Sequence, residues 1–141
     1  AVIIDAVTAA LMPGDLAGRR VVITAGGTRE PIDAVRVIAN RSSGRQGYVL
    51  AEVARRRGAE VDLISTVDVP PPAGVRLISV ETAAEMRDAV LRSSAGADVI
   101  IMAAAVADFR PVDTAGSKLK KTDGVPEIVL EPTPDILAEL G

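Results

Sequence analysis

The sequence has 141 residues, of which 48% are hydrophobic, and its formal net charge is −3. This length is typical of one domain, and the hydrophobic share is sufficient for a buried core. No apolar run reaches the ~18 residues of a membrane span, so we expect no membrane association. The acidic charge and the scarcity of aromatic residues, which are limited to Tyr48 and Phe109, argue against nucleic-acid binding.

Histidine and cysteine are both absent from the sequence. Their absence excludes disulfides, thiolate chemistry and a Ser–His–Asp triad built from these residues. General acid–base chemistry would therefore fall to Asp, Glu or Lys, or to the substrate itself. The lack of cysteine also fits our expectation of a cytoplasmic protein.

The elements predicted from the apolar pattern alternate between strands and helices. An amphipathic helix over residues 2–11 and a linker to residue 18 come first, ahead of a domain over residues 19–141. Thr82 and Glu85 form a capping box at the start of one helix. The predicted strands are 19–25, 60–66, 75–80 and 98–103, and the other helices are 47–57 and 82–95. This alternation predicts an α/β fold, a Rossmann-like, doubly wound and mainly parallel sheet with helices on both faces.

The pattern changes after the fourth predicted strand. Residues 114–124 are polar, show no periodicity and contain all three lysines, which predicts a flap. Residues 125–131 alternate between apolar and polar side chains, as a half-exposed strand does. A further helix begins in the segment 132–135 and runs to Gly141.

The stretch from Val21 to Gly47 has the pattern of a phosphate-binding turn. An apolar strand leads into Gly26 and Gly27, and Ser42-Ser43-Gly44 precedes the next helix. Backbone N–H groups at a helix start can bind phosphate. The ~15-residue insertion between the two turns is longer than the usual connection after a strand, which favours a functional role. The alternative interpretations are an ordinary tight turn and a serine N-cap.

Two further features are candidate site residues. Asp108 follows the fourth strand, where it could hold a magnesium ion or a ribose hydroxyl, or be an ordinary loop carboxylate. The run Lys118-Leu119-Lys120-Lys121 could close over phosphates, or it could be a solvated charged segment. A nicotinamide-dependent oxidoreductase is less well supported, because the third glycine of the G-x-G-x-x-G fingerprint is missing and Asp62 lies inside its strand.

Taken together, these motifs resemble the phosphopantothenoylcysteine synthetases (phosphopantothenate–cysteine ligases) of coenzyme A biosynthesis. The resemblance rests on ITAGGTREPID-x-VR-x-I-x-N-R-SSG-x-x-G, AAAVADFRP, KLKK and PDIL, which occur in the family's order from Leu16 onward. It is strongest to the bacterial, CTP-dependent form, which is usually fused behind a flavin-dependent decarboxylase. The chain departs from the family at Thr133, where an asparagine is usual, and further strands of the family lie beyond Gly141.

The resemblance implies a ligase that uses CTP and Mg²⁺. CTP would activate the carboxylate of 4′-phosphopantothenate as an acyl-cytidylate, and cysteine would then displace CMP. FMN would be present only with the fused decarboxylase, and a homodimer is expected. Asn40, Lys118 and Arg36 would be catalytic, and Asp108 would hold the metal ion. The nucleotide would be bound by Gly26, Gly27, Ser42, Ser43, Gly44, Ala104, Ala105, Asp108, Phe109, Lys118, Pro134, Asp135, Ile136 and Leu137. The alternatives are the oxidoreductase and a nucleotide-binding module without chemistry.

Overall fold

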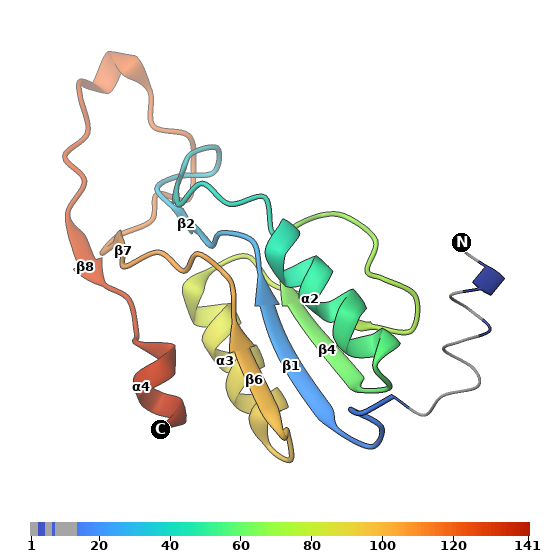
Figure 1. Cartoon of the computed structure of the whole chain (residues 1–141). Coiled ribbons are helices and arrows are strands. Elements are labelled where there is room, and N and C mark those ends of the chain that lie inside the picture. The colour runs from blue at the N-terminus through green and yellow to red at the C-terminus, as the bar shows by residue number, and fades with distance from the viewer. Residues whose placement is uncertain (1–2, 5–6, 8–13) are drawn as a thin grey trace.

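A four-stranded parallel sheet forms the centre of the molecule in a computed structural model, which describes residues 3–4, 7 and 14–141 (Figure 1). Its strand order is β5-β4-β1-β6. The strands are β1 (Arg20–Ala25), β4 (Glu60–Ser65), β5 (Arg76–Ser79) and β6 (Val99–Met102). All four were predicted, and the doubly wound α/β fold is confirmed.

One helix covers each face of this sheet (Figure 1). The helices are α2 (Arg45–Arg56) and α3 (Ala83–Ser94). Alternate residues of β1 face opposite ways, so Val21 and Ile23 pack with α2, whereas Val22 packs with α3. The continuous apolar run of β1 is thereby buried on both sides, as the sequence predicted. The predicted capping box of Thr82 and Glu85 is present at the start of α3.

The long insertion after β1 is a β-hairpin, which the sequence analysis missed. Its strands β2 (Arg29–Pro31) and β3 (Val37–Ala39) pair antiparallel. Each strand has only three residues, so no alternating apolar pattern could reveal it. The hairpin is fixed to the rest of the fold by the buried carboxylate of Glu30, which accepts a 2.8 Å hydrogen bond from the N–H of Ala83 at the start of α3.

The strand predicted over residues 125–131 is mostly wrong. The structure has β8 at Leu130–Pro132, paired antiparallel with β7 at Phe109–Pro111. Residues 125–129 precede it outside any strand, and Val125 is 98% exposed. An alternating pattern forms a strand only where a partner strand is available. β7 has only three residues, so it can pair with no more than three residues of this segment.

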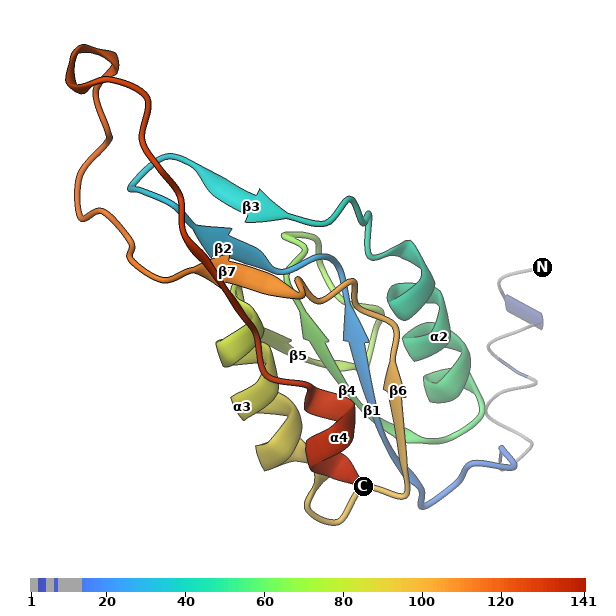
Figure 2. The ribbon, with the colours of Figure 1, turned by 90° about the vertical axis from the view of Figure 1, so that its left-hand side faces the viewer.

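The flap over residues 114–124 contains the short 3₁₀ helix η1 (Lys121–Asp123), and the chain ends with α4 (Ile136–Leu140) beside α3 (Figure 2). Most of the helix predicted over residues 2–11 lies outside the described residues. Within the part of the chain that the structure describes, no helix is both long and apolar enough to cross a membrane.

Candidate functional site

The carboxyl ends of β1 and β6 meet at the point where the strand order reverses. Gly27 and Ala105 form a parallel bridge there, and the N–H of Ala105 donates a 2.7 Å hydrogen bond to the carbonyl oxygen of Gly26. In open α/β sheets, ligands bind outside the carboxyl ends of the strands at such a reversal. The predicted glycine turn therefore lies at the position that a ligand site requires.

Gly26 and Gly27 are required at this turn because side-chain atoms of Thr66 pass close to the first and the backbone of Asn40 passes close to the second. Gly26 has a φ of +89°, and a Cβ atom there would lie 2.1 Å from the hydroxyl oxygen of Thr66. A Cβ atom on Gly27 would lie 2.5 Å from the carbonyl oxygen of Asn40. The turn and the end of the insertion are therefore in direct backbone contact, which side chains would prevent.

Helix α2 begins beside this turn without a side-chain cap. Its N-cap is Gly44, with a φ of 72°, so the interpretation of a serine as N-cap is wrong. The Ser42 hydroxyl accepts from the N–H of Gly44, the N-cap residue, at 3.3 Å, and the Ser43 hydroxyl accepts from that of Arg45, the first helical residue, at 3.4 Å. Both N–H groups precede those that a capping side chain accepts from. Apart from that of Arg45, the first-turn N–H groups and the positive end of the helix dipole thus remain directed at this site, an arrangement suited to phosphate.

Two buried threonines of the β1 segment fix the loop that leaves β6, a role that the sequence analysis missed. The Thr24 hydroxyl accepts a 3.0 Å hydrogen bond from the N–H of Ala104, and the Thr28 hydroxyl accepts one of 2.9 Å from the N–H of Ala107. Both threonines are fully buried. A polar side chain inside an apolar strand was the available signal, because such a group needs a partner.

A cavity of about 270 Å³ lies between the loop after β6 and the start of α4. It is lined by Met102, Ala104, Val106, Ala107, Asp108, Thr133, Pro134, Asp135, Ile136 and Leu137. Six of these are predicted nucleotide-binding residues from two segments far apart in sequence. Ala105 and Phe109 do not line it, and the Phe109 side chain is 54% exposed.

Thr133 joins the two sides of this cavity. Its N–H donates a 2.9 Å hydrogen bond to the carbonyl oxygen of Asp108, and its hydroxyl donates to the carbonyl oxygen of Ala107. The Asp135 carboxylate is the N-cap of α4 and accepts from the N–H of Ala138 at 3.1 Å. Asp135 therefore shapes the cavity wall through the helix start.

Asp108 is exposed at the mouth of this cavity. Among the described residues, no group of three or more Asp, Glu, His or Cys side chains could enclose a metal ion. Magnesium in nucleotide sites is commonly held by one or two carboxylates together with phosphate oxygens and water. Asp108 alone fits that smaller role, so its assignment to the metal stays a prediction.

Asn40 lies at the junction of the insertion and the loop after β6. Its side-chain amide donates a 3.0 Å hydrogen bond to the carbonyl oxygen of Val106, a residue that lines the cavity. The structure thus brings together Asn40, the glycine turn and the cavity.

Arg36 lies farther along the hairpin and is tied to the flap. Its guanidinium pairs with Asp33 and donates to the carbonyl oxygen of Leu119 at 3.3 and 3.5 Å. Lys118 is exposed next to this contact. Figures 1 and 2 both draw the flap that carries Lys118 beyond the hairpin, on the side away from α2.

Asp33 itself was not among the predicted site residues. Burial raises its pKa, but hydrogen bonds from the N–H groups of Val35, Leu119 and Arg36 and from the Arg36 guanidinium lower it to about 2. Asp33 is therefore an ionised carboxylate at neutral pH. Its signal in the sequence was its position three residues before an arginine in an otherwise apolar turn.

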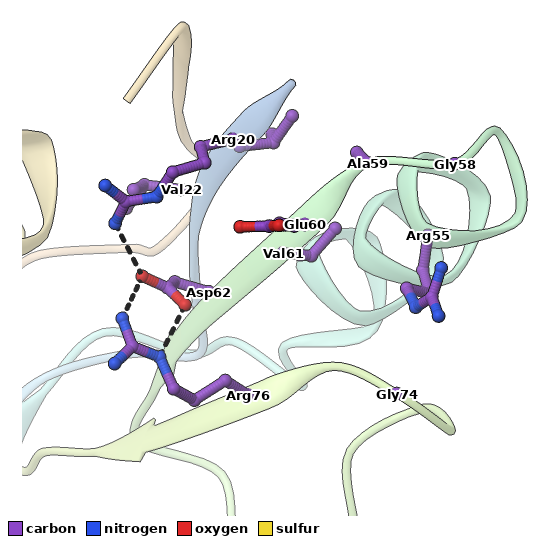
Figure 3. A pocket seen from close by; sticks show the side chains of 11 residues that line it. Arg20, Val22, Arg55, Gly58, Ala59, Glu60, Val61, Asp62, Gly74 and Arg76 are labelled. Carbon is purple, nitrogen blue, oxygen red and sulfur yellow. Dashed lines mark hydrogen bonds and ion pairs between the residues drawn. The ribbon is translucent and has the colours of Figure 1, made fainter. Parts of the chain in front are cut away.

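A larger cavity, of about 630 Å³, lies at the opposite ends of the strands (Figure 3). Of its two carboxylates, Glu60 and Asp62, the latter accepts from the Nε of Arg76 at 2.6 Å and lies 3.8 Å from the guanidinium of Arg20. A ribose-binding carboxylate would lie at the carboxyl end of β4, near the glycine turn, whereas Asp62 lies inside the strand and is paired with arginines at the opposite end of the sheet. The nicotinamide alternative therefore has no support at this position.

Comparison with known proteins identifies one family model and several similar curated proteins. The family model of the DNA/pantothenate metabolism flavoprotein C-terminal domain matches residues 16–141. The "Coenzyme A biosynthesis bifunctional protein CoaBC" of Mycobacterium tuberculosis is 54% identical over 130 residues, which are 90% of this chain and 31% of that protein. The protein of the same name from Bacillus subtilis is 50% identical over 128 residues, 89% of this chain and 32% of that protein.

A solved structure is also similar to this chain. The crystal structure of the C-terminal domain of a CoaBC protein has a TM-score of 0.77 and 46% sequence identity, covering 89% of this chain and 59% of that one. The chain spans about a third of the length of the curated relatives it matches.

Proposed function

Because the chain belongs to the family of the DNA/pantothenate metabolism flavoprotein C-terminal domain, we propose that it ligates 4′-phosphopantothenate with cysteine in coenzyme A biosynthesis. The observation that carries the proposal is the cavity at the sheet reversal. Its walls combine six predicted nucleotide-binding residues, and the glycine turn and Asn40 lie beside it.

The proposed reaction has two steps. CTP activates the carboxylate of 4′-phosphopantothenate as an acyl-cytidylate and releases pyrophosphate, and the amine of cysteine then displaces CMP. The first-turn N–H groups of α2 and the hydroxyls of Ser42 and Ser43 support triphosphate binding, since they converge beside the glycine turn. Asn40 would hold the acyl-cytidylate, and Lys118 would serve the amide-forming step.

This chemistry suits a site without histidine or cysteine. The reacting groups are supplied by the substrates, so the protein contributes position and stabilisation of negative charge. Mg²⁺ would neutralise the triphosphate, with Asp108 as its protein ligand. Arg36 keeps 48% of its side chain exposed, which leaves part of the guanidinium for a carboxylate or phosphate.

Several broader assignments belong to the same proposal. We expect a decarboxylase domain that carries FMN in the full-length protein, a cytoplasmic location and a homodimer. Exposed apolar side chains on β3, β7, β8 and the residues next to β7 and β8 favour the dimer, since exposed apolar surface can mark an interaction site. They include Val37, Phe109, Val112, Val129 and Leu130. Light scattering of the purified protein would measure its mass.

The decisive experiment supplies the full-length protein with CTP, Mg²⁺, 4′-phosphopantothenate and cysteine. We expect pyrophosphate release without cysteine and CMP release only when cysteine is added. Replacing CTP by ATP tests the nucleotide preference. Absence of both products would exclude the ligase and favour a nucleotide-binding module without chemistry, and consumption of a reduced nicotinamide would favour the oxidoreductase.

A further inference from the structure

The flap is attached to the insertion hairpin by a ladder of hydrogen bonds. At its start, the Thr114 hydroxyl donates to the carbonyl oxygen of Pro31 and the N–H of Ala115 to that of Ile32, both at 3.1 Å. Leu119 then donates its N–H to Asp33 at 3.1 Å. Between these points the chain is exposed, so the ladder is what holds the flap against the fold.

The two carboxylate oxygens of Asp33 have separate functions. Oδ1 accepts from the N–H groups of Val35 and Arg36, both at 2.8 Å, and so shapes the hairpin turn. Oδ2 accepts from the N–H of Leu119 at 3.1 Å and from the Arg36 guanidinium. One oxygen therefore serves the local turn, and the other reaches 86 residues along the chain to the flap.

Arg36 completes this contact from the other side. Its guanidinium donates to the carbonyl oxygen of Leu119, so both backbone groups of Leu119 are held by the Asp33–Arg36 pair. Lys118 immediately precedes Leu119, and its main chain is thereby fixed although its side chain is exposed. A long lysine side chain on a fixed main chain has a limited reach, which is what a catalytic position needs.

We propose that Asp33 is the positioning residue of the flap, which it latches to the hairpin through Leu119 so that Lys118 is presented to the amide-forming step. The attachment of the flap to the hairpin is supported by the hydrogen bonds described above. Its effect on catalysis rests on the proposed ligase function. An ionised carboxylate is required there because only an acceptor without N–H groups can meet four donors.

The substitution Asp33→Asn should break the contact with the flap while it keeps the contacts that shape the hairpin turn. The amide oxygen can keep the place of Oδ1, whereas the amide nitrogen would face the N–H of Leu119 and the guanidinium of Arg36, donor against donor. Asp98→Asn is the matched control. Asp98 likewise accepts from a backbone N–H, that of Arg20 at 2.8 Å, and from an arginine, Arg19 at 2.9 Å, but it lies away from the flap.

The first readout is trypsin cleavage of the folded, full-length protein without substrates. Because both backbone groups of Leu119 are held by the hairpin, cleavage of the Lys118–Leu119 bond requires this part of the flap to leave the hairpin, and its rate reports the latched fraction. We expect Asp33→Asn to raise this rate about tenfold, as loss of a charged hydrogen bond implies, and Asp98→Asn to leave it unchanged. Equal rates for wild type and Asp33→Asn would overturn the latch.

The second readout separates the two half-reactions. Asp33→Asn should slow CMP release with cysteine about tenfold and leave pyrophosphate release within about twofold of wild type. An equal decrease in both steps, or an unchanged CMP step in a protein whose flap is cleaved faster, would overturn the positioning role. If the wild-type protein is inactive in both steps, the ligase proposal is overturned. The trypsin assay would still test whether Asp33 attaches the flap to the hairpin.

A second variant tests the same contact without changing Asp33, in case Asp33→Asn misfolds the hairpin. Leu119→Pro removes the N–H that Asp33 accepts and leaves the turn of Asp33, Val35 and Arg36 intact. It lies on the flap, outside the buried core. Because trypsin does not cleave a lysine–proline bond, this variant is tested only in the half-reactions. CMP release should slow as in Asp33→Asn, and a wild-type rate of CMP release would contradict the proposal.

Discussion

The side-chain amide of Asn40 donates a 3.0 Å hydrogen bond to the carbonyl oxygen of Val106. This contact joins the end of the insertion to the loop after β6, two segments that are 66 residues apart in the sequence. It places the amide at the border between the glycine turn and the cavity. Asn40 therefore has a structural partner in addition to its proposed role toward the acyl-cytidylate.

Asn40→Asp replaces this donor by a carboxylate that would face the carbonyl oxygen of Val106. We expect the acyl-cytidylate to form, since the glycine turn and the start of α2 are unchanged. Its use should be impaired, with CMP release slowed by roughly tenfold to a hundredfold. Single-turnover measurement of pyrophosphate and CMP would check this, and equal loss of both steps would contradict the role given to Asn40.

Lys118→Gln removes the positive charge of the residue that directly precedes the latched residue Leu119. Nucleotide binding should remain detectable by calorimetry, because the glycine turn and the cavity do not contain Lys118. The amide-forming step should slow by about tenfold or more, the loss expected for one charged contact in the transition state. Lys121→Gln in the same flap is the control. Unchanged turnover in Lys118→Gln would make the lysine run a solvated segment.

Gly47→Ala tests the close approach of α2 to β1. A Cβ atom on Gly47 would lie 2.6 Å from the Cβ of Ala25 and 2.7 Å from the carbonyl oxygen of Thr24, so the helix must move away. We expect a loss of roughly 1–3 kcal/mol in the free energy of unfolding, measured by urea titration. Gly116→Ala, where nothing lies within 4 Å, should stay within about 0.5 kcal/mol of wild type.

Glu30→Ala should destabilise the protein because it leaves the N–H of Ala83 without its acceptor in a buried position. The expected loss is roughly 1–3 kcal/mol in the free energy of unfolding. Glu30→Gln retains an oxygen for this N–H and should lose less. Chemical unfolding of the three proteins would check the order, and an equal loss in both variants would show that the hydrogen bond to Ala83 is not the cause.

The free energy of unfolding should depend on pH in acid because the pKa of Asp33 is lowered by folding. Its pKa falls from 3.8 to about 2 in the fold, so the folded state binds this proton less readily than the unfolded state. The resulting stabilisation is complete above the unfolded pKa and is lost as pH falls through about 2. The difference in unfolding free energy between wild type and Asp33→Asn should therefore be constant above about pH 5 and shrink in acid. A difference that grew in acid would contradict this assignment.

The buried sheet and its helices could be predicted because their signals are local. β1 is a continuous apolar run ended by glycine, and Thr82 and Glu85 cap α3 within four residues of sequence. The glycine turn, the serines before α2 and the family resemblance likewise depended on residues close together in sequence. These features fixed the doubly wound fold and the end of the sheet at which the site lies.

Only the tertiary structure decided which distant segments meet. The three-residue strands of the hairpin have no periodicity of their own, and the alternation of residues 125–131 lacked a partner strand long enough to realise it. Asp33 is a polar loop residue in the sequence, and its significance comes from Leu119, 86 positions away. Hydrogen bonds between such segments form wherever the folded backbone brings donor and acceptor together, and no local pattern records that pairing.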